Sequence, residues 1–154
     1  MAYGKVFTPK VIHKGLDVSF IIDHNDCFMM TSFDIRFTLP NVEEEVPEDA
    51  FFTIEYIFYC YLKKSEYTDG IIHYGRLDRT GISINMSTFF DREKAFDFVV
   101  GMCRYFLALE KGEPSDSALI SKLQLGYDEA NRIVSDYLQL IESENGYTYK
   151  EEGE

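Results

Sequence analysis

The side chains best suited to bind another molecule gather in two stretches of this sequence. The first is a run of three carboxylates in the proline-containing segment 40–49: Glu43, Glu44 and Glu45. The second combines cations, carboxylates and an amide: Lys122, Asp128, Glu129, Asn131 and Arg132. Carboxylates attract Lys and Arg side chains of a partner, whereas Lys, Arg and Asn are the side chains that contact phosphates and base edges. Both stretches therefore indicate binding to a macromolecule.

Signatures of catalysis do not occur in the sequence. It contains no GxSxG, P-loop, HExxH or GxGxxG motif, and any pairing of its carboxylates as acid and base would be arbitrary. The run 23–27 holds a histidine, two aspartates and a cysteine, but adjacent residues of a tight turn seldom point to a common centre. We expect a hairpin turn there, and we expect His73 to be a half-buried residue of a strand. The chain is therefore predicted not to be an enzyme and to carry no cofactor or metal.

The charge of the chain limits its partners. It has 15 basic and 27 acidic residues, which gives a formal net charge of -12 at pH 7. Because phosphate contacts depend on Lys and Arg displacing counterions, this charge opposes binding to nucleic acids. The negative charge favours basic partners, but it is equally explained if its role is only to keep the protein soluble. Lys5, Lys10, His13 and Lys14 run against the overall sign, either as a basic arm or as the solvated edge of a strand.

Cysteine use and hydropathy indicate where the protein works. Cys27, Cys60 and Cys103 are far apart, odd in number and without metal-ligand spacing, which is typical of free thiols in a reducing compartment. The N-terminus lacks the apolar region of a signal peptide, and no apolar run reaches the ~18 residues of a membrane span. We therefore expect a soluble, cytoplasmic protein that does not cross a membrane.

The first part of the chain has the period of β-strands. Apolar and polar residues alternate, or apolar residues cluster between turn residues, in the segments 18–22, 27–30, 33–39, 71–76 and 81–87. The apolar parity changes between Met30 and Phe33, which predicts a bulge near Thr31 and Ser32. Short turns favour the pairing of consecutive strands, so we expect an antiparallel meander.

Segment 50–64 fits two structures. As a strand, its even-numbered apolar residues share one face; as a helix, Phe51, Ile54, Phe58 and Tyr61 do so. Acidic residues before the segment and two lysines at its end suit a helix dipole. The wealth of Phe, Tyr and Ile favours the strand.

After Phe90 the apolar period becomes that of a helix. Asp91 or Thr88 can cap a helix over 91–111 whose broad apolar face should pack on the sheet. Segment 117–141 then predicts a short helix, a turn at 125–127 in which Gly126 supplies a positive φ, and a longer helix with a regular apolar stripe. This is the outline of a helix-turn-helix, and 147–149 could add one short strand.

The run 125–133, LGYDEANRI, resembles the winged-helix gamma domain at the C-terminus of FtsK/SpoIIIE-type DNA translocases. Members of that family carry Ile-Gly-Tyr-Asn-Arg-Ala-Ala-Arg there, and Leu119 and Leu123 match apolar positions of the preceding helix. The resemblance covers about 25 residues and implies a winged helix that contacts DNA. Asp128 and Glu129 stand where the family has Asn-Arg, and they would repel a phosphate backbone, so most of the family's DNA contacts are not carried over.

We therefore predict an α+β protein with two parts. Residues 1–112 form an antiparallel sheet packed on one helix, and residues 113–154 form a helix-turn-helix with a short wing and an acidic tail. The protein is expected to dock a basic, nucleic-acid-handling protein partner, as small inhibitors from phages or mobile elements do when they occupy a nucleic-acid channel. The alternative is a DNA-binding winged-helix accessory protein that uses Lys122, Asn131 and Arg132.

Overall fold

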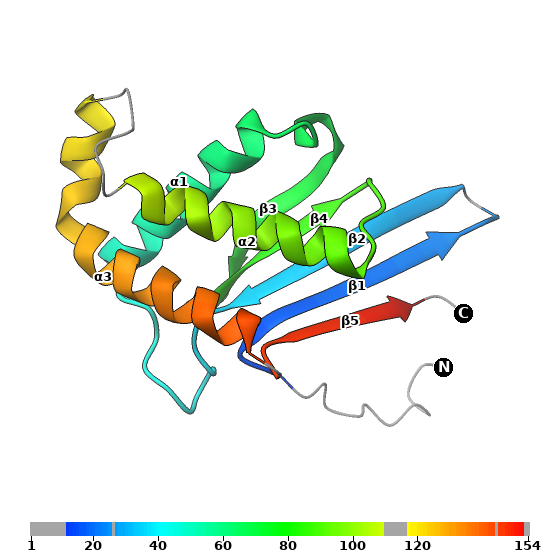
Figure 1. The fold of residues 1–154 in the computed structure, drawn as a ribbon, viewed down its shortest axis with the longest axis horizontal. Coiled ribbons are helices and arrows are strands. Elements are labelled where there is room, and N and C mark those ends of the chain that lie inside the picture. The colour runs from blue at the N-terminus through cyan, green and yellow to red at the C-terminus, as the bar shows by residue number, and fades with distance from the viewer. Residues whose placement is uncertain (1–11, 26, 110–116, 144, 153–154) are drawn as a thin grey trace, which may run out of the picture.

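The computed structural model describes residues 12–25, 27–109, 117–143 and 145–152. Helices and strands follow one another along these residues as Figure 1 shows. The strands are β1 (Gly15–Asp23), β2 (Phe28–Arg36), β3 (Ile71–Leu77), β4 (Gly81–Met86) and β5 (Tyr147–Glu152). The helices are α1 (Glu48–Lys64), α2 (Arg92–Ala108) and α3 (Ser117–Glu142), with the 3-10 helix η2 (Thr68–Gly70) just before β3. The predicted α+β content is confirmed.

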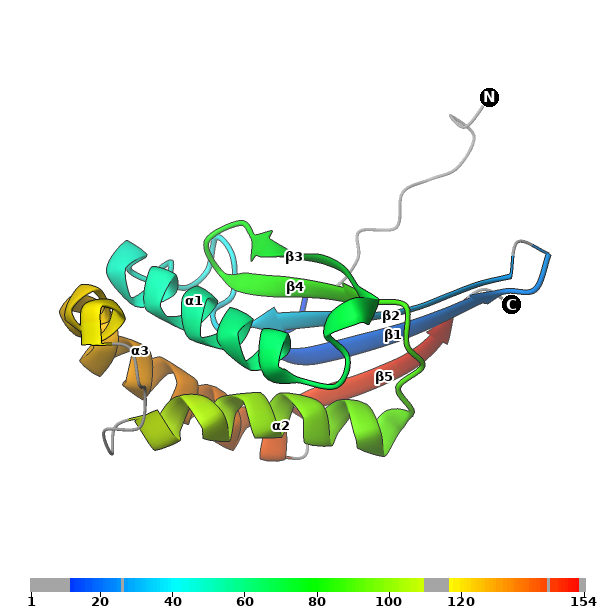
Figure 2. The ribbon, with the colours of Figure 1, turned by 90° about the horizontal axis from the view of Figure 1, so that it is seen from above.

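The strands form one sheet in the order β3-β4-β2-β1-β5, and the helices cover one of its faces (Figure 2). Two hairpins, β1–β2 and β3–β4, meet where β2 pairs antiparallel with β4. The predicted antiparallel meander is wrong in two respects. Helix α1 separates β2 from β3, so that β2 lies beside β4, and β5 runs parallel to β1 where a wing was expected.

Strand β2 does not contain the bulge predicted near position 31. Its nine residues pair with β1 in continuous register. Buried Thr31 takes an inward position, where its Oγ1 donates to the carbonyl oxygen of Thr88 at 2.7 Å and accepts from the Phe90 N–H at 3.2 Å. Because the Thr31 hydroxyl makes its hydrogen bonds inside the protein, this polar residue can face the core. Thr31, Phe33 and Ile35 therefore share the inward side of β2, and no bulge is needed. Phe28 then falls on the other parity and is exposed.

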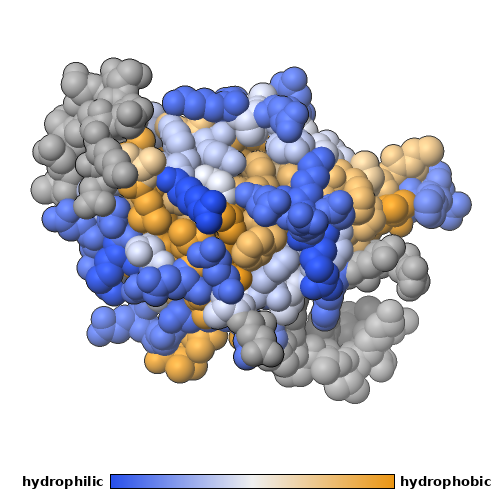
Figure 3. Space-filling model, viewed as in Figure 1, coloured by the Kyte–Doolittle hydropathy of each residue, from blue (hydrophilic) through white to orange (hydrophobic). Residues whose placement is uncertain are grey.

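The β1–β2 hairpin extends beyond its neighbours in the sheet. Among the described residues, β4 pairs with β2 as far as Thr31 and β5 pairs with β1 as far as Ile21, so that no other described strand lies beside the end of the hairpin. Figure 3 shows apolar surface that continues along this arm and gives way to hydrophilic residues at its tip. The turn with His24 and Cys27 therefore lies away from the rest of the sheet.

Segment 50–64 is helical, so the preference for a strand was wrong. Its buried residues recur with the period of a helix: Ala50, Phe51, Thr53, Ile54, Ile57, Phe58 and Leu62. Glu48 and Asp49 occupy the first turn, and Lys63 and Lys64 occupy the last turn, which stabilises both ends of the helix dipole. Strand propensity of aromatic residues reflects packing on a half-buried surface, and here a helix provides that surface.

Residues 117–142 form one continuous helix, so the predicted helix-turn-helix is wrong. Gly126 lies inside α3 and is buried. A Cβ atom on it would lie 2.4 Å from the carbonyl carbon and oxygen of Asp49 and 2.7 Å from the Ala50 nitrogen. The glycine therefore allows the backbones of α3 and α1 to approach each other, and it does not end a helix.

A single hydrophobic core joins the sheet to all three helices. Its members include Leu16, Ile35, Phe58, Phe106 and Val134. Asp91 caps α2 as predicted, because its side chain accepts from the Lys94 N–H at 2.8 Å. The inward stripe predicted for the second half of α3 is confirmed at Val134, Tyr137 and Ile141. The boundary predicted after residue 112 thus falls between α2 and α3, which share this core.

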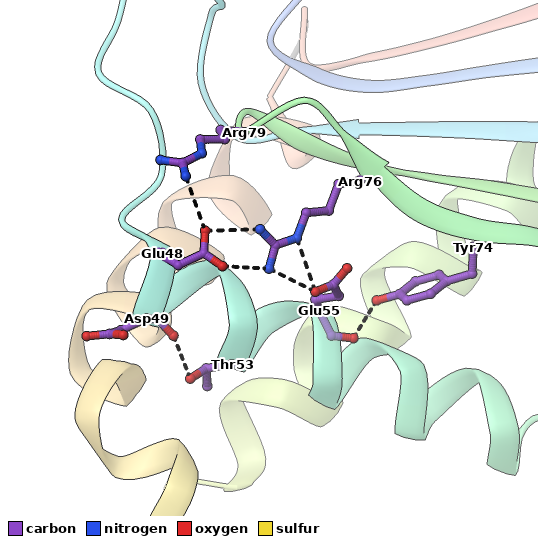
Figure 4. A network of polar contacts seen from close by, with 7 residues as sticks. All are labelled: Glu48, Asp49, Thr53, Glu55, Tyr74, Arg76 and Arg79. Carbon is purple, nitrogen blue, oxygen red and sulfur yellow. Dashed lines mark hydrogen bonds and ion pairs between the residues drawn. The ribbon is translucent and has the colours of Figure 1, made fainter.

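Arg76 ties the edge strand β3 to α1 (Figure 4). Its guanidinium donates to Glu48 Oε2 at 3.1 Å and to Glu55 Oε1 at 3.1 and 3.2 Å, and it lies 4.4 Å from the centre of the Phe51 ring. The nearby Tyr74 hydroxyl donates to the Glu55 carbonyl oxygen at 2.5 Å. Such charge-assisted contacts are stronger than neutral hydrogen bonds, so α1 is held to the sheet from outside the core as well.

The close approach at Gly126 can be tested with two glycine-to-alanine variants. Gly126→Ala should lower the free energy of unfolding in urea by about 2 kcal/mol, because the new methyl meets backbone that cannot move aside. Gly101→Ala in α2 is the matched control. Its methyl would meet only the Tyr61 hydroxyl, at 2.6 Å, and that side chain can turn away. The control should change stability by less than about 1 kcal/mol, and equal losses in both variants would contradict the close approach.

The Arg76 contacts predict a pH dependence of stability. Hydrogen bonds from Arg76 hold the pKa of Glu48 below its ordinary value. This stabilisation is therefore complete above the ordinary carboxyl pKa of about 4.3 and is lost as the pH falls through the lowered value. Glu48→Gln should be less stable than the natural chain at pH 7, and the difference should shrink under acid. Glu66→Gln is the control, because it removes an exposed carboxylate just beyond α1 that is not a partner of Arg76. If the stability difference of this control shrinks under acid by as much as that of Glu48→Gln, the effect does not come from the Arg76 contacts.

Candidate functional site

The residues predicted to bind a partner through a helix start do not lie at one. Asp128 and Glu129 occupy the middle of α3, with Asp128 exposed and the side chain of Glu129 43% exposed. Asn131 is half-buried, and its Nδ2 atom is buried. The side chain of Lys122 lies outside the described residues. The interpretation of 128–132 as the leading edge of a recognition helix is therefore wrong.

Two of the predicted sets nevertheless meet in one groove. A cavity of about 680 Å³ opens between the loop 38–47 and the second half of α3, and we call it the acidic groove. Its charged lining residues are Lys14, Glu43, Glu44, Glu45, Glu129, Arg132 and Asp136. Five carboxylates thus face two cations, although loop and helix are far apart in sequence. Asp128 and Asn131 do not line the groove.

The loop side of the groove is built around Glu43. Its carboxylate accepts from the Leu39 N–H at 2.9 Å and from Lys14 Nζ at 3.1 Å. The Leu39 N–H, and after it the Lys14 ammonium, hold the pKa of Glu43 below its usual range. Glu44 and Glu45 remain exposed beside it. Lys14, predicted as part of a basic arm or a strand edge, instead fastens the acidic loop, whereas Lys5 and Lys10 lie outside the described residues.

The helix side of the groove is built around Arg132. Its guanidinium contacts Glu129 one turn before it and Asp136, whose Oδ2 lies 3.4 Å from Nη1, one turn after it. The hydrogen bonds from Arg132 hold the pKa of Glu129 below its usual range. Two carboxylates thus contact Arg132, which opposes its predicted use on phosphates. Asp136 was missed from sequence, although its spacing to Arg132 is that of a helical ion pair.

The floor of the groove is apolar. It consists of Phe37, Val46, Pro47, Ile133, Tyr137 and Leu140. Phe37 and Val46 are buried and anchor the two ends of the loop, and the Phe37 ring packs edge-on against Tyr137 at 5.1 Å between ring centres. Val46 is further held by a hydrogen bond from its N–H to the Arg79 carbonyl oxygen at 3.1 Å. The groove therefore has an acidic rim over an apolar floor.

The other candidate residues form no comparable site. Within the described residues, no three His, Cys, Asp or Glu side chains come together to hold a metal ion. Asp23 instead accepts from the Asn25 N–H at 3.0 Å, as in the expected hairpin turn. His73 is exposed in the edge strand β3 rather than half-buried.

Burial raises the pKa of the Cys60 thiol and raises that of Cys103 to about 12, so these thiols are not activated as nucleophiles.

Comparison with protein-family models and with curated proteins finds no match to this chain. None of the described helices combines the length and the apolar character that a membrane span requires.

The hydroxyl of Tyr137 provides a test of the groove's inner wall. This residue is buried, and its Oη has no hydrogen-bond partner among the described residues. Tyr137→Phe should raise the free energy of unfolding by about 1 kcal/mol, because it removes a desolvated polar group. Tyr74→Phe is the matched control and should lower it by about 1 kcal/mol, since that hydroxyl donates to the Glu55 carbonyl oxygen. Equal destabilisation of both variants would mean that the Tyr137 hydroxyl has a bound partner in solution, such as water.

Proposed function

We propose that this chain is a non-catalytic binding protein whose acidic groove receives a basic segment of a protein partner. The observation that carries the proposal is the meeting of Glu43, Glu44 and Glu45 with Glu129 and Asp136 around one apolar floor. Carboxylates attract Lys and Arg, and apolar floors accept aliphatic or aromatic anchors. An amphipathic segment with basic and apolar sides fits both features.

The groove carboxylates are suited to remain charged and are not suited to act as general acids. A general acid at neutral pH needs a raised pKa, whereas the pKa values of Glu43 and Glu129 are lowered by their hydrogen bonds. These two groups therefore stay charged. Fixed negative charge is suited to steering a basic partner and holding it in register.

A basic protein suits the groove better than DNA does. The rim would present mostly carboxylates to a phosphate backbone, and Arg132 is already engaged by Glu129 and Asp136. Proteins that handle nucleic acids carry basic channels of the complementary sign. Inhibition of such a protein by occupying its channel, as small inhibitors from phages or mobile elements do, is one form that this function would take.

The proposal can be tested by fluorescence anisotropy with a labelled amphipathic peptide that has a Lys-rich and a Leu-rich face. The chain should bind this peptide, with affinity that falls from about 50 mM to about 500 mM salt because part of the attraction is electrostatic. Glu44→Lys/Glu45→Lys should weaken binding about tenfold or more, because it reverses the charge of the rim. Labelled duplex DNA, offered in the same way, should not bind.

A control variant distinguishes binding in the groove from attraction by the net charge of the whole chain. Glu66→Lys/Asp128→Lys changes the net charge by the same amount at exposed positions that do not line the groove. This variant should bind the peptide within about twofold of the natural chain. If it weakens binding as much as the groove variant does, the attraction is diffuse and the groove is not the site. DNA binding that Glu44→Lys/Glu45→Lys leaves unchanged would contradict the proposal in favour of the nucleic-acid alternative.

A further inference from the structure

Helix α1 has a second apolar stripe on the face opposite to the core. Phe52 and Tyr59 lie on this face and are 45% and 43% exposed, and half-buried Tyr56 lies between them. Phe52 and Tyr56 lie with ring centres 6.4 Å apart, and Tyr59 and Tyr74 lie 5.8 Å apart. Adjacent exposed aromatic rings mark protein–protein contact surfaces, where Tyr and Phe are enriched.

The spacing of the stripe is that of a helix pair. Residues 49, 52, 56, 59 and 63 are separated alternately by three and four positions, which is the a/d pattern of a coiled coil. We call these five residues the α1 seam: Asp49, Phe52, Tyr56, Tyr59 and Lys63. A helix that only covers a globular core needs no such second seam, because its inward face already supplies the burial.

The charges of the seam indicate what covers it. The seam begins with exposed Asp49 and ends with exposed Lys63. If two copies of α1 run antiparallel about a twofold axis near Tyr56, Asp49 of each copy meets Lys63 of the other, and Phe52 meets Tyr59. The helix dipoles also oppose each other in this arrangement. A parallel pair would place Asp49 beside Asp49 and Lys63 beside Lys63. The charges of the seam therefore match those of a second copy only when the two helices run antiparallel.

We propose that the α1 seam binds the α1 seam of a second copy of this chain, so that the protein is an antiparallel dimer. A hollow of about 200 Å³ beside the seam, lined by Phe52, Glu55, Tyr56, Tyr59 and Tyr74, gives an incoming aromatic ring a place to insert. Glu48 and Glu55 border the seam, and their charges are already balanced by Arg76, which contacts both, and by Arg79, which contacts Glu48 (Figure 4). They therefore do not oppose the approach of a second copy.

The dimer surface is separate from the acidic groove. No residue of the α1 seam lines the groove, and the groove is formed by the loop 38–47, Lys14 and α3. A dimer would therefore carry two grooves and could bind two basic segments. An experiment that disproves the dimer therefore does not affect the proposed function of the groove, and the reverse also holds.

The dimer can be tested by sedimentation equilibrium of the full chain from about 1 µM to about 1 mM. The natural chain should show a concentration-dependent monomer–dimer equilibrium. Asp49→Lys and Lys63→Asp should each weaken the dimer about tenfold or more, because each variant alone creates like-charge contacts at both ends. An equimolar mixture of the two variants should form a heterodimer, since every end contact is again between opposite charges.

Two controls exclude other effects of the charge-reversing variants Asp49→Lys and Lys63→Asp. Asp69→Lys makes the same change at an exposed position outside the seam and should leave the dimer unchanged. Thermal unfolding of each variant checks that its monomer is folded. A natural chain that stays monomeric over the whole range would leave the seam to a helix of another protein and overturn the proposal. A dimer that Asp49→Lys does not weaken, or variants whose mixture fails to associate, would overturn it as well.

Discussion

The contact between the backbones of α3 and α1 at Gly126 determines the rest of the architecture. Because no side chain separates the helices there, α3 crosses the first turn of α1 without a break. Its second half then lies beside the loop 38–47, which enters α1 directly. Together with the packing of Phe37 against Tyr137, this contact sets the position of Glu129, Arg132 and Asp136 relative to the acidic loop.

Packing and charge have different roles in the groove. Exposed ion pairs such as Arg132 with Asp136 contribute little to stability, because water and salt screen them. Apolar burial contributes roughly 25 cal/mol for each Å² removed from water, so a partner that covers exposed Pro47 and half-buried Ile133 and Leu140 gains more there. The floor is therefore suited to supply affinity, while the acidic rim selects the sign of the partner and steers its approach.

Local patterns in the sequence were enough to predict the hairpins, the Asp91 cap of α2 and the inward stripe of α3. The acidic run of the loop and the charged set around Arg132 were also recognised, but not that Glu129 and Arg132 share a groove with the loop. Their meeting depends on contacts such as Phe37 against Tyr137, which join segments far apart in the chain. Gly126 was misread for the same reason: a glycine that ends a helix and one that lets two backbones touch look alike until Asp49 is placed beside it.

The misreading of segment 50–64 as a strand follows from the same residues that form the α1 seam. A helix with one apolar face leaves its other positions polar, and its 3.6-residue period is then plain. In α1, Phe52, Tyr56 and Tyr59 fill the second face with aromatic residues, so that the apolar pattern resembles a strand with strong β-propensity. Burial of the inward face accounts for Phe51, Ile54 and Phe58, and Tyr56 packs partly against the core, but Phe52 and Tyr59 remain exposed. Their presence on a solvent-facing helix is explained if that face is covered by another helix of matching length and opposite direction.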